Sequence, residues 1–391
     1  MTTPTGPFCM DEFQRHTLTT DQNTLRGVDG LRFPLLGLFG EVGSLLSALK
    51  IKQRDRASYV GYEESVIEEF GDVLWYFANV AARANVELSA LAQRVHRANP
   101  DTGYELSSEL VSFQHLQAPT DTALTPIFEH RLIQLAGQVG RLMDDVANNL
   151  VEHNPDALTD HLVNILRALV AAAREANIDL DDAAQRNILK TRSRWPSPED
   201  RAHPPLFDND DDPEERLPRC IVMDIAERGT AQRRYVRLRC NGITIGDRLT
   251  DNKADEDDYR FHDVFHLGYA AILGWSPVTR ALFKVKRKSK PGIDETEDGA
   301  RAAIIEEGIA TWIFSHARKL QYFDAITALD YPLLKTVQAH VQGYEVERCP
   351  LWLWEKAILD SYAVFRQLRI VRQGVVVADL AHRTITFTAL P

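Results

Sequence analysis

The stretch Ile67-Glu-Glu-Phe-Gly-Asp-Val-Leu-Trp-Tyr-Phe-Ala-Asn-Val-Ala-Ala82 repeats apolar side chains at helical intervals, with carboxylates near its start. An earlier run, Phe33-Pro-Leu-Leu-Gly-Leu-Phe39, has the same apolar character. With few strand signals between them, these runs predict helix from Asp11 to about Ala98. The segment Asn99-Pro-Asp-Thr-Gly103 breaks the pattern, and helical periodicity resumes from about Thr125 through Lys190. The first half is therefore predicted to be mainly α.

Two landmarks recur in the same order within this helical half. Gly40-Glu-Val-Gly-Ser-Leu45 is echoed by Gly137-Gln-Val-Gly-Arg-Leu142, and Ala84-Asn-Val-Glu-Leu88 by Ala176-Asn-Ile-Asp-Leu180. The pattern indicates a tandem duplication, with one helical repeat over residues 1–110 and a degenerate repeat over 111–197. Coincidence between two alanine- and leucine-rich helical hairpins is the alternative interpretation.

The character of the chain changes after Trp195. Prolines and the run Asp208-Asn-Asp-Asp-Asp-Pro-Glu-Glu215 predict a solvated acidic linker over residues 198–217. Strand-like segments follow at the beginning and end of residues 218–391, and helical patterns fill the interval from about Tyr259 to Gln373. This region is therefore predicted to be an α+β domain of unknown role.

Composition restricts the classes of function. The 391 residues carry 56 acidic and 45 basic side chains, a formal net charge of −11, which argues against coating nucleic acid through bulk charge. The four cysteines are scattered, so neither a disulfide framework nor a zinc ribbon is indicated. No secretory signal is evident and no stretch is expected to span a membrane. We expect a cytoplasmic protein.

Three carboxylates stand out in the first repeat. Glu69 and Asp72 are three residues apart and so lie on one side of a helix, where Glu41 from a neighbouring helix can join them. Magnesium prefers such hard oxygen ligands. A metal bound there would neutralise a triphosphate and orient an attacking water, with Glu68 or Glu64 as the base. The alternative is a solvated, acidic helix start that complements the helix dipole.

These residues carry a resemblance to a known family. Asp11-Glu-Phe-Gln14, Phe39-Gly-Glu-Val-Gly-Ser-Leu-Leu46 and Ile67-Glu-Glu-Phe-Gly-Asp-Val-Leu-Trp-Tyr76 resemble the MazG-like nucleoside triphosphate pyrophosphohydrolases. The resemblance implies an all-α bundle that uses Mg²⁺, with Mn²⁺ as a substitute. It implies metal ligands at Glu41, Glu69 and Asp72, catalytic roles for Glu41, Glu68 and Glu69, and a substrate contact at Asn79. The family's second glutamate in E-x-x-E is Ser44 here, a weaker ligand, which puts metal number and rate in doubt.

The second repeat departs further from the family pattern. Its corresponding positions are Gln138, Arg141, His161 and Asn164, which cannot hold magnesium in the same way. It ends in a basic segment resembling the tail that follows the bundle in relatives. We therefore predict a fused pseudo-dimer in which the second copy supplies phosphate-binding cations, Lys190 and Arg194, assisted by Lys50 and Lys52. The alternative is that these are ordinary helix-end cations.

The C-terminal region contains a second set of candidate ligands. His262 and His266 are four residues apart, Asp263 is adjacent, and Glu306 and Glu307 lie on a later helix. The spacing suits a transition metal. The alternative is that the histidines make ordinary core hydrogen bonds. The segment resembles a region that follows MazG-like modules in some bacterial proteins, which implies an association with nucleotide metabolism or defence.

Three functional hypotheses follow. The first is a nucleotide pyrophosphohydrolase that cleaves (d)NTPs between the α and β phosphates, in pool cleansing or phage defence. The second is a nucleotide-sensing regulator with weak turnover. The third is a metal-dependent nuclease or hydrolase in the C-terminal domain, controlled by the bundle. The expected partner is a nucleotide, without membrane or bulk nucleic-acid binding, and a homodimer stays open.

Overall fold

The computed structural model describes residues 9–23, 25, 27–97, 111–117, 126–150, 154–230 and 233–390. The chain forms two compact units, Met1–Pro198 and Glu199–Pro391. The predicted break at Asn99–Gly103 lies outside the described residues. The prediction of a mainly helical protein followed by an α+β region is confirmed.

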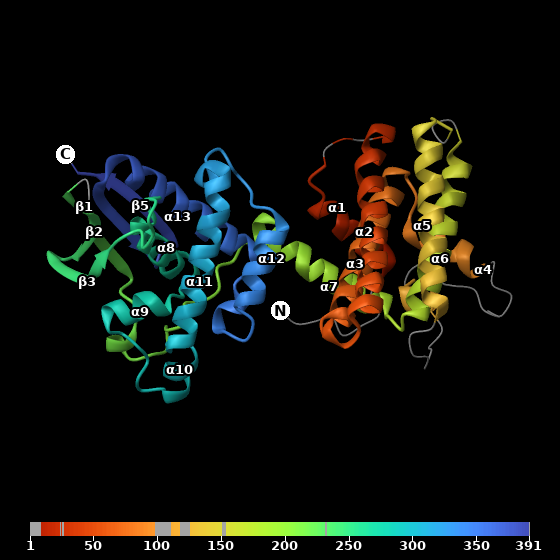
Figure 1. Ribbon diagram of the computed structural model, residues 1–391. Helices are drawn as coiled ribbons and strands as arrows, with labels where there is room; N and C mark the ends of the chain where they lie inside the picture. The colour runs from red at the N-terminus through yellow and green to blue at the C-terminus, as the bar shows by residue number, and fades with distance from the viewer. Residues whose placement is uncertain are drawn as a thin grey trace. The chain divides into compact units, whose positions relative to one another are not determined.

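The first unit is a bundle of helices. Its elements are α1 (Met10–Thr20), α2 (Gly27–Asp55), the 3-10 turn η1 (Arg56–Ser58), α3 (Tyr62–Arg83), α4 (Leu88–Arg97), η2 (Phe113–Leu116), α5 (Pro126–Ala147), α6 (Pro155–Glu175) and α7 (Leu180–Arg194). Helix α2 packs on α3 and α5, α5 packs on α6, and α7 packs on α3 (Figure 1). Apolar side chains from both predicted repeats share one hydrophobic core. The two predicted repeats therefore pack as a single unit.

Two helices of the bundle end in the same way. Asn85 and Asn177, which follow α3 and α6, both adopt left-handed φ angles of 58° and 55°. In each case a glutamine side chain then hydrogen-bonds to two backbone groups of the turn that follows. Gln14 donates to Val86 O and accepts from Leu88 N, whereas Gln117 donates to Ile178 O and accepts from Leu180 N. The turns after α3 and α6 thus have the same backbone conformation and the same glutamine hydrogen bonds, which position the next helix.

Helix α2 corrects one expectation. Within the described residues, Gly30–Ser58 form one helix that is long and apolar enough to cross a membrane by length and composition, although no such stretch was expected. Leu35, Leu38, Val42 and Leu45 are buried in the bundle core. An apolar helix that supplies a protein core passes the same test, because burial in protein and burial in lipid favour the same side chains.

The second unit combines an antiparallel sheet with helices. The strands are β1 (Cys220–Thr230), β2 (Arg233–Cys240), β3 (Ile243–Leu249), β4 (Gln373–Asp379) and β5 (Thr384–Ala389), in the order β3-β2-β1-β4-β5. Helices α8 (Asp263–Leu273) and α13 (Leu351–Val371) pack against β4 and β5 (Figure 1). Alternate residues of β1, including Ile221, Met223 and Ile225, are buried in the core.

Shorter elements complete this unit. They are η3 (Pro198–Asp200), η4 (Pro213–Glu215), η5 (Tyr259–Phe261), α9 (Pro277–Phe283), α10 (Pro291–Thr296), α11 (Ala300–Ala317), η6 (Arg318–Phe323), α12 (Tyr331–His340) and η7 (Glu345–Arg348). Strand β3 was not predicted. Asn241 and Gly242, with φ angles of 50° and 79°, turn the chain between β2 and β3. An Asn-Gly pair between two strand-like runs is a hairpin signal that would have found it.

The prediction of a solvated linker over residues 198–217 needs a correction, because part of this segment is buried. These residues, apart from Pro198, belong to the second unit. Asp208 and Asp211 are buried. Asp208 accepts hydrogen bonds from Leu217 N at 2.8 Å, Arg219 at 2.7 Å and Arg280 at 2.8 Å. A run of carboxylates repels itself only while it lacks partners, and buried arginines supply them here.

Candidate functional site

Glu41, Glu69 and Asp72 converge in the first unit. One ligand oxygen from each side chain lies within 4.8 Å of the others. Glu41 comes from the middle of α2, and the other two are one helical turn apart on α3. Because α2 and α3 pack along their length through apolar residues, their polar positions meet at the same level. The predicted convergence is therefore present.

Mutual repulsion and burial alter the acidity of this cluster. Burial is the largest cause that raises the pKa of Glu69 to about 8, followed by its hydrogen bond with Glu41 and the charges of Glu41, Asp72 and Glu68. The pKa of Glu41 is also raised, by burial first and then by Asp72. The raised pKa values show that the carboxylates destabilise one another when all are charged. A bound divalent cation would offset this repulsion, so these oxygen ligands fit a divalent metal.

Helix α7 brings a cation to the same cluster. Lys190 Nζ contacts both carboxylate oxygens of Asp72, one of them at 2.5 Å, and lies 3.4 Å from Glu68 Oε1. Asn187 Nδ2 donates to Asp72 Oδ1 at 2.7 Å. The predicted meeting of acids from α3 with Lys190, which lies on α7, is observed in this geometry. Asn187 was not predicted, although its spacing of three residues from Lys190 puts both on one helix face.

Ser44 and Asn79 have different surroundings. Ser44 hydrogen-bonds to Glu41 and so adjoins the cluster. Asn79 is completely buried, where it donates to Trp75 O at 2.9 Å and accepts from Arg83 at 3.2 Å. Arg83 is in turn paired with Asp21. A substrate contact by Asn79 would require these hydrogen bonds to break.

The remaining predicted cations have other environments. Lys50 is exposed, and Lys52 Nζ lies 5.3 Å from the centre of the Tyr62 ring. They follow Glu41 by about 13 to 17 Å along α2, given the rise of an α-helix. Arg194 stacks on Trp195, 4.5 Å from its ring centre. In the predicted second repeat, His161 pairs with Asp145 at 2.7 Å and Asn164 accepts from Arg167 at 3.2 Å.

Gly71 sets the approach of α7 to the carboxylates. A Cβ added there would lie 2.7 Å from Ala183 O and 3.0 Å from Asn187 Cβ. Gly71→Ala is therefore expected to destabilise the protein by about 1–3 kcal/mol through overpacking and to displace Lys190 from Asp72. Chemical unfolding measures the loss. Gly43→Ala is the control, because nothing lies within 4 Å of its added Cβ, and we expect stability unchanged or raised. Equal effects of the two variants would contradict this role of Gly71.

The raised pKa of Glu69 predicts a pH dependence. Its carboxyl stays protonated up to about pH 8 in the folded chain and ionises near its ordinary value of 4.5 when unfolded. The associated stability is complete below about pH 4.5 and is lost as the pH rises through about 8. Thermal unfolding in chelator should therefore show Tm falling across this window. Glu69→Gln should flatten the profile, and Mg²⁺ should reduce the fall because it replaces the proton. A profile identical in wild type and Glu69→Gln would refute the assignment.

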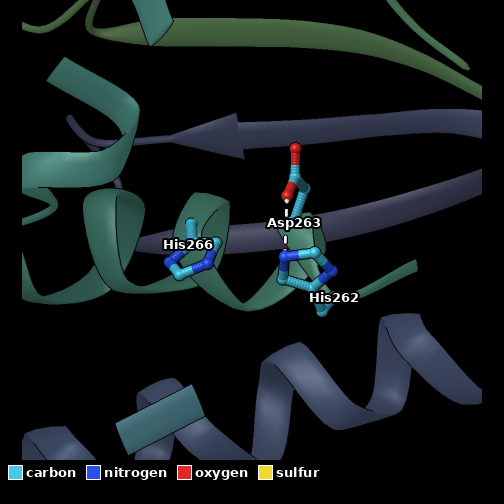
Figure 2. A group of neighbouring side chains, drawn as sticks. All are labelled: His262, Asp263 and His266. Atoms are coloured by element: carbon cyan, nitrogen blue, oxygen red, sulfur yellow. Dashed lines mark ion pairs between the residues drawn. The ribbon is translucent and has the colours of Figure 1, made fainter. Parts of the chain in front are cut away.

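The second unit holds the other predicted cluster. One ligand atom each from His262, Asp263 and His266 lies within 4.8 Å of the others. Figure 2 shows the Asp263 carboxylate paired with His262, with His266 further along α8. Glu306 and Glu307 approach from α11, Glu306 Oε1 at 2.8 Å from His266 Nδ1 and Glu307 Oε1 at 3.4 Å from His266 Nε2. All five predicted residues are thus brought together.

The imidazoles of this cluster differ in acidity. Burial opposes charging of His266, but Glu306 and then Glu307 outweigh it, so its pKa is raised well above the ordinary value. Burial lowers the pKa of His262, and nearby Asp263 only partly offsets this. The pKa values of the two histidines are therefore shifted in opposite directions.

Two comparisons find similarity between this chain and known sequences. Gene 37 protein of Mycobacterium phage L5 is 35% identical over 69 residues, which are 17% of this chain and 60% of that protein. The chain thus spans about three fifths of the length of that relative. No solved structure matches the chain. The family model described as the MazG C-terminal domain matches residues 202–391. Residues 202–391 of the second unit, acidic segment included, are therefore similar to the MazG C-terminal domain.

Proposed function

We propose that the first unit hydrolyses nucleoside triphosphates between the α and β phosphates, releasing a nucleoside monophosphate and pyrophosphate. The observation that carries the proposal is the convergence of Glu41, Glu69 and Asp72, from two helices, with Lys190 against them. Carboxylates grouped with a phosphate-pairing cation suit the binding of a metal–triphosphate complex. The MazG-type second unit supports the same family of activities.

Each residue of the cluster has a role in this proposal. Glu41, Glu69 and Asp72 would hold Mg²⁺, or Mn²⁺ as a substitute, which when bound neutralises phosphate charge and acidifies a coordinated water. Glu68 is the proposed base, since it lies beside the ligands, 3.4 Å from Lys190. Lys190 balances Asp72 in the absence of metal and turns to the phosphates when nucleotide binds.

A tandem duplication is part of the proposal. The matched asparagine and glutamine devices after α3 and α6 support it. In this arrangement the first copy provides acids and the second provides Lys190 and Asn187, as in a pseudo-dimer. We further propose a cytoplasmic location, a nucleotide as the principal partner, and a role in pool cleansing or phage defence. Whether two such chains form a homodimer is decided by measuring the oligomeric state.

A nucleotide-panel hydrolysis screen tests the activity. Purified full-length protein is incubated with each canonical and modified (d)NTP, with Mg²⁺ or with chelator, and monophosphate and pyrophosphate are quantified separately. Equal amounts of the two products in Mg²⁺, and neither in chelator, are expected. Release of inorganic phosphate in place of pyrophosphate would show cleavage of a different bond and overturn the proposal.

A nucleotide-sensing regulator is the second candidate. It is favoured by Ser44, which replaces a carboxylate beside Glu41, and by the engagement of Asp72 with Lys190 and Asn187. Both features weaken metal binding relative to nucleotide binding. Calorimetry that detects nucleotide binding, combined with negligible pyrophosphate release, would select this function over hydrolysis.

A further inference from the structure

The histidine cluster of the second unit has fixed ring orientations. His262 Nδ1 lies 2.9 Å from Tyr259 O, and its ring stacks on that of Tyr259, with centres 4.3 Å apart and planes 2° apart. A carbonyl oxygen can only accept, so His262 donates from Nδ1. Its Nε2 is consequently the atom that offers a lone pair when the ring is neutral.

His266 is oriented by a buried carboxylate. Its Nδ1 lies 2.8 Å from Glu306 Oε1. Glu306 is completely buried and also accepts from Ser276 Oγ at 2.7 Å and from Val278 N at 2.9 Å. With its oxygens held in this way, Glu306 positions His266. Carboxylate–histidine pairs of this kind commonly orient metal-bound imidazoles.

The two Nε2 atoms face a common set of acidic oxygens. His262 Nε2 lies 3.4 Å from Asp263 Oδ1 and 3.9 Å from Glu307 Oε2, and His266 Nε2 lies 3.4 Å from Glu307 Oε1. The His266 side chain is 2% exposed, and within the described part of the chain its Nε2 makes no hydrogen bond of regular geometry, with Glu307 as its ion-pair partner. A buried ring nitrogen left in this state, beside a second imidazole and two carboxylates, points to a missing ligand.

We propose that the second unit binds a divalent transition-metal ion, with Zn²⁺ as the best-fitting ion, through His262 Nε2, His266 Nε2 and the carboxylates of Asp263 and Glu307. Two imidazoles and two carboxylates match the ligand types and number of tetrahedral zinc. Ligand atoms of His262, Asp263 and His266 lie within 4.8 Å of one another, and Glu307 lies 3.9 Å from His262 Nε2 and 3.4 Å from His266 Nε2. Glu306, Ser276 and Tyr259 act as positioning groups behind the ligands.

One side of this site is open to solvent. The Glu307 side chain is 43% exposed, whereas those of His262 and His266 are 8% and 2% exposed. Zinc sites that keep an exchangeable position support hydrolysis, and closed sites are structural. If water or a phosphate oxygen replaced Glu307 as a ligand, the site would have an exchangeable coordination position. This site is independent of the carboxylate cluster on α2 and α3.

Metal titration of the full chain tests the proposal. The host protein carries Glu69→Gln and Asp72→Asn, so that the outcome does not depend on the proposed site in the first unit. After chelator treatment it is titrated with Zn²⁺ in excess Mg²⁺, and with Co²⁺ to record the d–d spectrum. One equivalent of Zn²⁺ per chain, with a tetrahedral-type Co²⁺ spectrum, is expected.

Substitutions then assign the ligands. His262→Gln and the half-exposed Glu307→Gln should each weaken Zn²⁺ binding by more than the roughly 10–100-fold expected for loss of an orienting partner. Glu306→Gln should fall within that range and shift the Co²⁺ spectrum. His382→Ala is the control, because that imidazole is 79% exposed and pairs with Asp379. Circular dichroism verifies folding, and Glu307→Gln keeps the test valid if a histidine variant misfolds. The proposal would be overturned if the folded host bound no stoichiometric Zn²⁺, or if all variants bound Zn²⁺ equally. The cluster would then be an ion-pair network only.

Discussion

Asp72→Asn is expected to reduce pyrophosphate release by about 10²–10³-fold, because it removes one metal ligand and the charge that holds Lys190. Asparagine matches aspartate in size, so Asn187 can keep a hydrogen bond to the remaining oxygen. Glu69→Gln should give a loss of similar size. If both residues act through one metal, the double variant should lose little more than either single one. Initial rates of pyrophosphate release under saturating Mg²⁺ measure these effects.

Glu63→Gln provides the matched control. Glu63 lies in the first turn of the same helix and is exposed. The substitution removes an identical charge from α3 without touching the cluster, and we expect turnover to stay within about twofold, since such surface changes are nearly neutral. Full turnover in Asp72→Asn and Glu69→Gln would eliminate the cluster as the catalytic site. A loss in Glu63→Gln as large as theirs would attribute the effect to helix charge instead.

Asp208→Asn is expected to destabilise the second unit by about 3–5 kcal/mol, because it removes the nearer of the two charge partners of buried Arg280, the other being Asp298 at 3.6 Å. The Asp208 and Arg280 side chains are 1% and 2% exposed and lie 2.8 Å apart. Burial raises the pKa of Asp208, but Leu217 N, Arg280 and Arg219 outweigh it and lower the pKa overall. This stabilisation is therefore present at neutral pH and is lost as the pH falls below about 4. Chemical unfolding followed by tryptophan fluorescence measures it, since Trp275 and Trp354 are buried in this unit.

Asp210→Asn separates burial from acidity. Asp210 belongs to the same acidic run but is exposed. Its substitution should change the free energy of unfolding by no more than about 0.5 kcal/mol. If Asp208→Asn and Asp210→Asn behaved alike, the acidic run would act as the solvated linker that its composition suggests. A large difference in the free energy of unfolding would show that Asp208, unlike the exposed Asp210, belongs to the folded core of the unit.

Local pattern was sufficient for part of the carboxylate site. The spacing of Glu69 and Asp72 put them on one helix face, and the apolar runs around Glu41 predicted a neighbouring helix that could carry the third acid. The position of Lys190 was predicted through the proposed repeat. Asn187 was missed because amide side chains are common on helices, and only the packing of α7 on α3 at Gly71 gives this one a role.

Composition gave a misleading prediction for the acidic run, because the ion-pair partners of this run are distant in the sequence. The run from Asp208 to Glu215 looked solvated, but its partners Arg280, Arg287 and Lys290 lie some 70 to 80 positions further along the chain. The strand Ile243–Leu249 was missed for a different reason. It lies at the sheet edge and is mostly exposed, so it lacks the apolar alternation that marks a half-buried strand.

By itself, the sequence determined the helical first half, the α+β second half and the identity of the acids and histidines that cluster. These depend on residue type and on spacing within one or two turns of a helix. Only the tertiary structure decided that Asp208 and Asp211 of the acidic run are buried, that Lys190 and Asn187 reach Asp72, and that Glu306 orients His266 while Glu307 faces both rings. Each of these depends on side chains brought together from distant helices, and such contacts leave no periodic signal in the chain.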